Sequence, residues 1–267
     1  RFWVEGPHVS RKRKPGQFVI VRGSENGERI RLTIADVDKT RGAISLVIQG
    51  VGKSTRQLNS LNEGDHILDL VGPLGRATEI HPGRRVCCIG GGIGTAVVYP
   101  IASGFKALQG NVVVIIGGRT KDLVILEHEL RAVADAVIVT TDDGSYGTKG
   151  LVTDALKELL AEGHTFDEVV AVGPLPMMKA VVGVTRPLNI PTTVSLNPLM
   201  VDGTGMCGGC RVSVGGEQKF VCVDGPEFNG LEVDFDELQA RVRAYREQEQ
   251  ESLRLYNAQI ACQAAIS

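Results

Sequence analysis

Along residues 1–82, short apolar runs alternate with glycine-containing turns. The β-rich runs are Phe18 to Arg22, Ile30 to Ile34, Ala43 to Gln49 and His66 to Val71. Short strands at such spacing are typical of small antiparallel barrels. The pattern predicts an antiparallel β-barrel over residues 1–82.

From Arg84 onward the pattern changes to buried-type apolar runs that alternate with longer helical stretches. Strands are expected at Val86 to Ile89, Val112 to Ile116, Ala136 to Thr140 and Glu168 to Val172. Helices are expected at Ile93 to Leu108, Asp122 to Ala134, Leu151 to Glu162 and Pro176 to Thr185, the last interrupted by Gly183. This alternation predicts a Rossmann-like parallel sheet with crossover helices over residues 83–193, and therefore a mixed β and α/β fold.

Residues 194–233 form a third predicted unit, in which glycine-rich, cysteine-bearing turns surround two short strands, Arg211 to Val214 and Lys219 to Cys222. The unit is too small for its own core, so a metal or cluster would supply cohesion. Residues 234–267 are a charged tail, with a peripheral helix expected from Phe235 to about Gln259. That helix is either a solvated surface element or a partner contact.

The charge balance excludes two classes of partner. The chain has 29 Lys and Arg against 31 Asp and Glu, which gives no basic surface for nucleic acid or anionic membranes. The uncharged stretch from Val86 to Phe105 contains five glycines and a proline, so a buried strand-turn-helix explains it better than a membrane span. Three of the six cysteines lie within sixteen residues, which indicates a metal-binding cluster in a reducing cytoplasm. The chain starts at Arg1 without a methionine, and a few residues are expected to precede it.

The segment Val86 to Thr95 runs from a strand through glycines into a helix. Backbone N–H groups at such a helix start bind a pyrophosphate. The candidate contacts are Gly91, Gly92, Ile93, Gly94 and Thr95. The alternative is a tight strand-helix turn that binds nothing.

Three further strand ends carry candidate nucleotide contacts, because open parallel sheets bind ligands at this edge. Gly173, Pro174 and Met177 form either the wall of a nicotinamide pocket or a helix start with packed methionine. Arg119 and Thr120 lie where an adenosine ribose is bound, and Arg119 either holds a 2'-phosphate or reaches into solvent, which leaves NAD and NADP both open. Asp142 and Asp143 belong to a turn or contact the cofactor.

The most specific motif has the spacing D-x4-C-x2-C-x11-C, formed by Asp202, Cys207, Cys210 and Cys222. Plant-type 2Fe-2S sites use C-x4-C-x2-C and a distant fourth cysteine, so Asp202 stands at the first ligand position. Structural zinc on the same four groups is the alternative, although zinc sites usually place cysteines in two separated pairs. Cys87, Cys88 and Cys262 are interpreted as packed or surface thiols.

With barrel, glycine-rich nucleotide unit and cysteine loop in this order, the chain resembles the ferredoxin-reductase-like electron-transfer subunits. This family includes the small subunits of bifurcating NADH-dependent ferredoxin:NADP oxidoreductase and of sulfide dehydrogenase and, more distantly, that of dihydroorotate dehydrogenase. The most specific matches are Val201 to Cys210 and Val223 to Phe228. The dihydroorotate relatives carry cysteine at the position of Asp202, which favours the bifurcating subunits.

The resemblance implies FAD in the barrel, bound by segments 29–33, 51–55 and 72–75. The implied contacts are Arg29, Arg31, Leu32, Thr33, Gly52, Ser54, Thr55, Gly72 and Gly75. The superfamily pattern R-x-x-S/T has Ile30 at its arginine position here, so either Arg29 or Arg31 is the pyrophosphate contact. Thr33 is a hypothetical hydrogen-bonding neighbour of the flavin.

The sequence thus predicts a flavin-dependent NAD(P)H oxidoreductase subunit that carries electrons between NAD(H), FAD and a 2Fe-2S cluster. The resemblance implies a partner large subunit with its own flavin and iron-sulfur clusters, and ferredoxin as an indirect partner. No side chain is expected to act as a strong acid or base, because the cofactors supply the chemistry. The alternatives are a dihydroorotate or sulfide dehydrogenase subunit and, in another class, a zinc-stabilised binding module without enzymatic activity.

Overall fold

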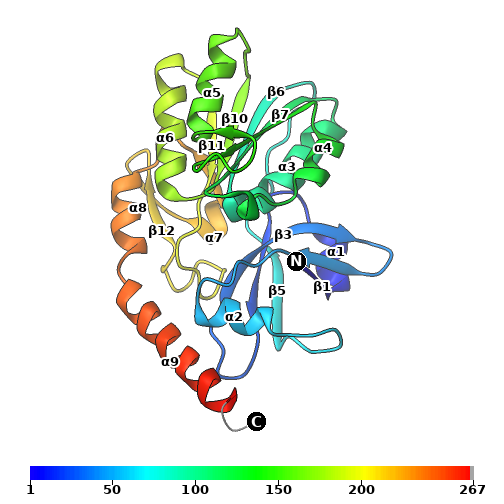
Figure 1. Cartoon of the computed structure of the whole chain (residues 1–267), viewed down its shortest axis with the longest axis vertical. Coiled ribbons are helices and arrows are strands. Elements are labelled where there is room, and N and C mark those ends of the chain that lie inside the picture. Colours follow the sequence, from blue (N-terminus) through cyan, green and yellow to red (C-terminus); the bar gives the residue numbers. More distant parts are fainter. Residues whose placement is uncertain (265–267) are drawn as a thin grey trace.

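The computed structural model describes residues 1–264. An antiparallel sheet, a larger mostly parallel sheet with helices on both faces, and a small hairpin unit lie side by side (Figure 1). None of the helices in residues 1–264 has the length and hydropathy of a membrane span.

The first sheet has five antiparallel strands in the order β1-β4-β3-β2-β5. Their bounds are Phe2–Glu5 (β1), Phe18–Arg22 (β2), Ile30–Asp38 (β3), Ala43–Leu46 (β4) and Asp69–Leu74 (β5). Val19, Val21, Leu32, Ile34 and Ile44 fill its interior, because alternate residues of each strand face the same side. Since β1 and β5 lie at opposite edges, the sheet is an open half-barrel, and the predicted antiparallel unit is confirmed in this form.

Details of this unit differ from the prediction. The strand β4 ends at Leu46 rather than Gln49, and β5 begins three residues later than expected. The sequence pattern did not predict β1 or two helices, α1 (Pro7–Lys12) and α2 (Lys53–Asn59). These are short elements of four to seven residues, too short for a clear period.

The second sheet has the order β14-β11-β10-β6-β7-β8-β9, with all neighbours parallel except the edge strand β14. The bounds are Arg85–Gly91 (β6), Asn111–Gly118 (β7), Ala136–Thr141 (β8), Thr148–Lys149 (β9), Glu168–Val172 (β10), Thr192–Ser195 (β11) and Glu227–Asn229 (β14). Helices α3 (Thr95–Ala107) and α4 (Glu127–Val133) cover one face, and α5 (Val152–Ala161) and α6 (Leu175–Thr185) cover the other (Figure 1). The predicted Rossmann-like parallel sheet with crossover helices is confirmed.

Cys87 and Cys88 are fully buried on opposite faces of β6. Burial raises the pKa of both thiols. Their predicted role as packing residues agrees with this placement, while Cys262 is exposed on the last helix.

Four predicted helices need correction. The stretch from Asp122 to Ala134 is a short 3-10 turn followed by α4, because Leu126 has a left-handed backbone with φ of 57° that interrupts the helix. The helix expected from Ile93 starts as α3 at Thr95, and Gly183 does not interrupt α6. The tail is two helices, α8 (Phe235–Val242) and α9 (Arg246–Ala264).

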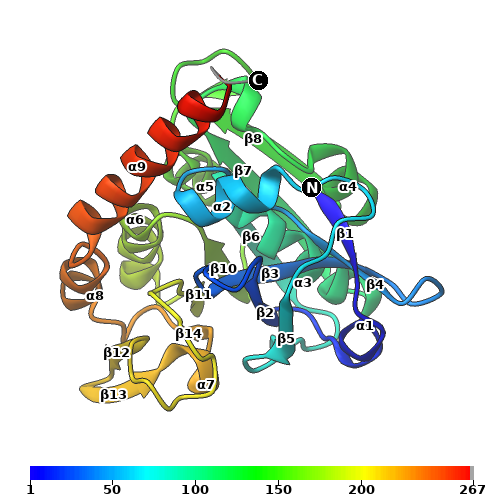
Figure 2. The ribbon, with the colours of Figure 1, turned by 90° about the horizontal axis from the view of Figure 1, so that it is seen from below.

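The third unit contains the hairpin β12 (Arg211–Val214) and β13 (Glu217–Phe220), followed by the short helix α7 (Val221–Asp224) (Figure 2). Cys222 therefore lies on a helical turn, not at the end of the predicted strand. Val212, Val221 and Phe235 share one core with the parallel sheet, and β14 pairs with β11. The unit has little core of its own, as its size predicted.

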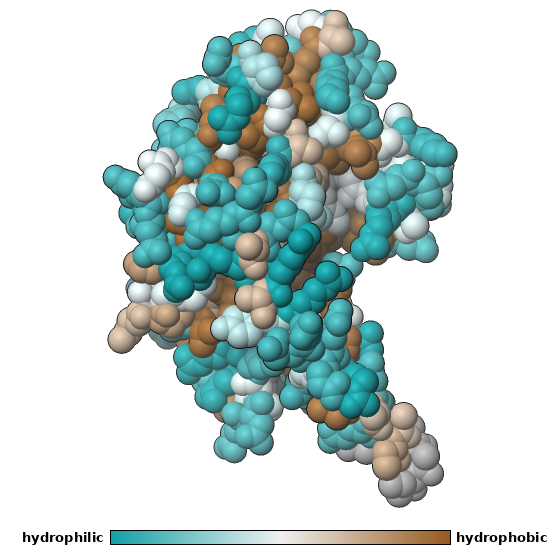
Figure 3. All heavy atoms as spheres, turned by 90° about the vertical axis from the view of Figure 1, so that its left-hand side faces the viewer, coloured by the Kyte–Doolittle hydropathy of each residue, from teal (hydrophilic) through white to brown (hydrophobic). Residues whose placement is uncertain are grey.

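The helix α9 runs back across the molecule beside α2 (Figure 2), where Arg56 Nη1 donates to Asn257 Oδ1 at 2.9 Å. Hydrophilic residues cover most of the molecular face shown in Figure 3. The tail helix α9 thus packs beside α2, and most of its described residues are exposed.

Candidate functional site

The glycine-rich turn after β6 is pressed against the end of β10. A Cβ atom on Gly94 would lie 2.2 Å from the carbonyl oxygen of Val172, so only glycine fits there. Gly92 has a positive φ of 52°, which also favours glycine. The turn leads directly into α3, whose first N–H groups lack partners within the helix and therefore suit an anion.

The end of β10 meets the same turn. A Cβ atom on Gly173 would lie 2.7 Å from Cε of Met177, and one on Gly91 would lie 2.3 Å from its Sδ. The structure thus brings Gly91, Gly94, Gly173 and Met177 together, next to Pro174. Met177 fills the space between the two turns, which supports the packed-methionine interpretation of this residue.

The ends of β7 and β8 are more exposed. Arg119 is exposed, and Thr120 is partly buried. Asp143 Oδ1 accepts hydrogen bonds from Ser145 N at 2.9 Å and Ser145 Oγ at 2.7 Å, and these bonds lower the pKa of Asp143. Asp143 therefore closes its own turn, while Asp142 is exposed beside it. The structure supports a turn here and leaves a cofactor contact as a prediction.

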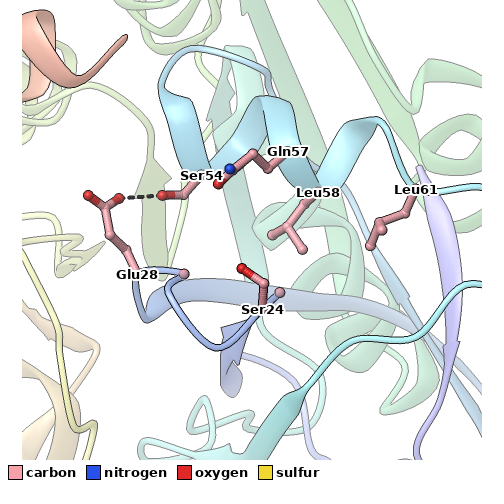
Figure 4. Close-up of a pocket in the computed structure, with 8 residues that line it drawn as sticks. Ser24, Glu28, Ser54, Gln57, Leu58 and Leu61 are labelled. Carbon is pink, nitrogen blue, oxygen red and sulfur yellow. Dashed lines mark hydrogen bonds between the residues drawn. The ribbon is translucent and has the colours of Figure 1, made fainter. Parts of the chain in front are cut away.

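The start of α2 lies beside the loop that leads into β3. Gly52 N donates to Thr55 Oγ1 at 3.0 Å, and the Ser54 hydroxyl donates to Glu28, as Figure 4 shows. A cavity of about 160 Å³ opens between this loop and α2. The predicted contacts Gly52, Ser54 and Thr55 are thus close together, near the exposed Arg29.

The other predicted barrel residues have different surroundings. Leu32 is 8% exposed and points into the barrel core, away from the faces of Arg31 and Thr33. Gly72 lies within β5, packed against Val19. Gly75 follows with a φ of 76° and packs against Phe18. The structure therefore separates Leu32 from the other proposed flavin contacts.

Arg31 contacts the segment that follows β11. Its Nη1 donates to Asn197 Oδ1 at 3.0 Å and approaches the carbonyl oxygen of Leu196 at 3.5 Å, and its guanidinium lies 4.9 Å from the centre of the Phe18 ring. Burial lowers the pKa of Arg31 to about 10. Of the two arginines considered for the pyrophosphate, Arg29 is exposed and directly follows Glu28, which accepts the bond from Ser54 of α2.

Several buried polar atoms at the junction of the two sheets have no partner within residues 1–264. These atoms are Nε of Arg13, Nε and Nη2 of Arg31, and the hydroxyl oxygens of Thr95 and Ser195. Unpartnered buried polar groups cost about 1–3 kcal/mol each, so each of these atoms is a candidate contact for a polar ligand. Together with the glycine turns, this junction fits a dinucleotide and a flavin. Thr95 and Arg31 are predicted contacts. Ser195 and Arg13 were missed, because the strand at Thr192–Ser195 and the position of Arg13 near Tyr99 were not foreseen.

In the cysteine loop, Asp202 organises the backbone. Its Oδ2 accepts hydrogen bonds from the N–H groups of Met206 at 3.0 Å and Cys207 at 2.9 Å, and its Oδ1 accepts one from Thr204 at 3.1 Å. Burial opposes ionisation, but the N–H donors of Thr204 and Cys207 outweigh it and hold the pKa of Asp202 at about 2. Asp202 is therefore a carboxylate at neutral pH.

The four predicted metal ligands form two pairs. Asp202 Oδ1 lies 3.4 Å from Cys207 Sγ, and Cys210 Sγ lies 3.2 Å from Cys222 Sγ. Cys207 is exposed, whereas Cys210 and Cys222 are buried. Within residues 1–264, no three His, Cys, Asp or Glu side chains are arranged to hold a single metal ion. Two separate pairs fit a two-iron cluster, in which each iron takes two protein ligands, better than one tetrahedral zinc ion.

Backbone amides also point toward the sulfur atoms. Gly209 N donates to Cys207 Sγ at 3.5 Å, and Cys222 N donates to Cys210 Sγ at 3.4 Å. Such N–H to sulfur contacts stabilise iron-sulfur clusters and influence their potential. The donor set and its surroundings fit an iron-sulfur cluster.

Comparison with known proteins agrees with this fit. Residues 197–234 match the iron-sulfur cluster binding domain of dihydroorotate dehydrogenase B. The chain is 49% identical to a solved chain of NADH-dependent reduced ferredoxin-NADP oxidoreductase, a structure described in terms of flavin-based electron bifurcation, with a TM-score of 0.90 and coverage of 96% of this chain and 92% of that one. The cytochrome b5 reductase domain of Ulva prolifera nitrate reductase shares the fold, with a TM-score of 0.59 at 21% identity over 70% of this chain and 86% of that one.

These likenesses define the class: the chain is a ferredoxin-reductase-like oxidoreductase component with a C-terminal iron-sulfur binding segment. Among curated proteins, it is 51% identical to the dihydroorotate dehydrogenase B (NAD(+)) electron transfer subunit homolog of Thermotoga maritima, over 93% of this chain and 87% of that protein. It is 32% identical to the corresponding electron transfer subunit of Fusobacterium nucleatum, over 87% of this chain and 92% of that protein. The chain belongs to the family of dihydroorotate dehydrogenase B electron transfer subunits and their homologs. The predicted family and the iron-sulfur prediction are confirmed, and the zinc alternative is set aside.

Proposed function

We propose that this chain is the subunit that carries electrons between NAD(H), FAD and a 2Fe-2S cluster in a flavin-based bifurcating ferredoxin:NADP oxidoreductase. It works with a larger partner subunit that carries its own flavin and iron-sulfur clusters, and it acts in the cytoplasm. The observation that carries the proposal is the pairing of Asp202 with Cys207 beside Cys210 and Cys222. The likeness to the ferredoxin-NADP oxidoreductase chain supports the bifurcating role.

The residues near the sheet junction are proposed to bind the nucleotide and the flavin. The glycine turns at Gly91, Gly94 and Gly173 allow a pyrophosphate to approach the backbone, and the Thr95 hydroxyl has no hydrogen-bond partner among residues 1–264. Arg29, Ser54 and Thr55 around α2 are proposed to hold the FAD phosphates, with Thr33 near the ring. Bound flavin supplies the conversion between two-electron and one-electron transfer.

This chain's own residues orient and shield the cofactors. Asp202 and the three cysteines hold the cluster, and the donors from Gly209 and Cys222 stabilise negative charge on sulfur. No acid or base is required among the side chains, since the redox groups carry the chemistry.

A second function has specific support. Several relatives are named as electron transfer subunits of dihydroorotate dehydrogenase B, so a role with a dihydroorotate-oxidising partner is the alternative. A sulfide dehydrogenase subunit is a further variant of the same chemistry. The partner distinguishes these functions, because this chain contributes the same electron path to each.

Purification of the chain with its natural partner tests the proposal. We expect a flavin absorption band at about 450 nm with broad iron-sulfur absorption, and we expect the flavin band to bleach when NADH is added. The co-purified subunit should itself contain flavin and iron-sulfur clusters. A colourless protein would refute the proposed function, and a dihydroorotate-oxidising partner would replace it with the alternative.

A further inference from the structure

Two arginines bind the glycine loop that lies between two of the cluster cysteines. Nη1 of Arg211 donates to the carbonyl oxygen of Gly208 at 3.0 Å, and Nη2 of Arg241 donates to the carbonyl oxygen of Gly209 at 3.5 Å. The first arginine begins β12, and the second belongs to the last turn of α8. Together they are called the loop arginines.

The bond from Arg211 fixes the direction of one peptide unit. The carbonyl group of Gly208 and the N–H group of Gly209 belong to the same planar trans peptide, so they point in opposite directions. Arg211 holds the carbonyl end, and the N–H end donates to Cys207 Sγ at 3.5 Å. A hydrogen bond at one end of a peptide polarises the group at the other end. Arg211 therefore acts on Cys207 through this peptide.

Both loop arginines extend from anchored elements. β12 pairs with β13, and α8 lies beside β12 (Figure 2). Asp234 caps α8 by accepting N–H bonds from Asp236 at 3.1 Å and Glu237 at 2.9 Å, and its own N–H donates to a backbone carbonyl of β12 at 2.9 Å. Leu238 of α8 is fully buried in the core. Helix α8 is thus more than a solvated surface element, because it fixes the position of Arg241.

The positive charges of the loop arginines are not used in ion pairs within residues 1–264. The ion pairs of α7, β13 and α8 join other residues: Arg76 with Asp224, Lys219 with Glu217, and Lys179 with Asp236. Both loop arginines are partly buried, so solvent screens their charges only in part. Three thiolates and the Asp202 carboxylate bring four negative charges to a cluster, and reduction adds one more. Positive charge beside the loop therefore favours the reduced cluster.

We propose that Arg211 is a positioning residue, which aims the N–H group of Gly209 at Cys207 Sγ and raises the reduction potential of the iron-sulfur cluster. Arg241 supports the next peptide and adds its charge. The inference rests on the proposed function, because it concerns the cluster through which electrons leave this chain. Two basic side chains thus control how readily that cluster takes an electron.

The test is an anaerobic redox titration of the purified full-length chain, in which electron paramagnetic resonance follows the reduced cluster. Arg211→Met removes the donor and the charge with little change in side-chain length. At a fixed solution potential, its ratio of reduced to oxidised cluster should fall about threefold to tenfold relative to the natural chain, the value of one hydrogen bond. A tenfold fall corresponds to a midpoint potential lower by about 59 mV for a one-electron couple.

Three further variants separate this role from a simple loss of charge. Arg243→Met removes the same charge from an exposed residue near the end of α8, so screening should keep its change in the ratio below about twofold. Arg211→Lys keeps the charge and a donor, so it should recover most of the lost potential. Arg241→Met should lower the ratio by about twofold to threefold, because its bond to the loop is longer.

Equal shifts of the midpoint potential in Arg211→Met and Arg243→Met would refute the inference, and so would an unchanged potential in Arg211→Met. If Arg211→Met holds no cluster, the decision passes to Arg241→Met, which keeps the bond from Arg211. A natural midpoint potential in that variant would then refute the inference.

A failure of this inference is distinguishable from a failure of the proposed function, because the titration requires neither NADH nor the partner subunit. A chain with a cluster and an NADH-reducible flavin, but with no effect of Arg211→Met on the potential, would refute the inference alone. A chain that shows the expected shift and co-purifies with a dihydroorotate-oxidising partner would refute the proposed function and keep the inference. A chain that holds no cluster would refute both.

Discussion

Asp202 Oδ1 lies 3.4 Å from Cys207 Sγ, while the same carboxylate accepts N–H bonds from Thr204, Met206 and Cys207. One side chain thus serves two purposes, since it shapes the loop and stands at the position of a cluster ligand. This double role makes its replacement informative.

Asp202→Cys should keep a cluster but change its visible spectrum and midpoint potential, because thiolate is a softer ligand than carboxylate. Asp202→Ala should lose the cluster, since it removes a ligand and the acceptor of the loop amides. Absorption spectroscopy and redox titration measure both effects, with Glu217→Gln at the exposed hairpin as control. An unchanged spectrum and potential in Asp202→Cys would exclude Asp202 as a ligand.

Gly94→Ala tests the contact between the glycine-rich turn and β10. The new methyl group would lie 2.2 Å from the carbonyl oxygen of Val172, and we expect a loss of about 1–3 kcal/mol in the free energy of unfolding. Gly183→Ala is the matched control, because no atom lies within 4 Å of its Cβ position in helix α6. The free energy of unfolding of Gly183→Ala should increase by up to about 1 kcal/mol. Urea unfolding measures both, and equal effects would contradict the close packing.

Thr95→Val tests whether the unpartnered hydroxyl serves a ligand. Within residues 1–264 this hydroxyl has no hydrogen-bond partner, so the valine variant of the cofactor-free protein should be as stable as the natural chain or about 1 kcal/mol more stable. Its affinity for NADH or FAD should fall about 3- to 10-fold, the value of one hydrogen bond.

The control for this change is Thr185→Val, because the Thr185 hydroxyl accepts a bond from Thr192 at 2.7 Å. That variant should lose stability and keep cofactor affinity. Unfolding curves and ligand titrations supply the comparison. A Thr95→Val protein that is destabilised yet binds both cofactors normally would show that the hydroxyl has no ligand role.

Glu227→Gln should change how stability depends on pH. Burial raises the folded pKa of Glu227 to about 7 and its usual value is 4.5, so its contribution is fully present below pH 4.5 and is lost as pH rises to about 7. Relative to the natural chain, the glutamine variant should therefore gain up to about 3 kcal/mol over this range and nothing more above it. Unfolding free energies measured at several pH values check this prediction. A difference between the two proteins that stays constant with pH would contradict a raised pKa of Glu227 in the folded protein.

The sequence pattern predicted both sheets because long strands such as β6 and β7 are nearly continuous apolar runs, and because glycine marks their ends. It did not predict β14, three residues long, since that strand exists only by pairing with β11. The break before α4 at Leu126 could not be predicted either, because no sequence pattern marks a leucine with a left-handed backbone.

The site shows the same division. The glycine turns could be predicted because only glycine has the backbone freedom that such turns need. The cluster ligands could be predicted because their spacing is visible in the sequence. The contacts of Arg31 could not be predicted. Strand alternation places its side chain on one face of β3, but it does not reveal that Asn197 and Phe18 lie beside that face. The pairing of Asp202 with Cys207 and of Cys210 with Cys222 likewise depends on how the loop folds onto α7.

The most direct measurement of the central claim is electron paramagnetic resonance of the protein after anaerobic chemical reduction. A 2Fe-2S cluster on the two ligand pairs should give a spin one-half signal of about one unpaired electron per chain. That signal should change shape in Asp202→Cys and disappear in Cys207→Ser. A reduced protein with bound zinc and no such signal would contradict the account.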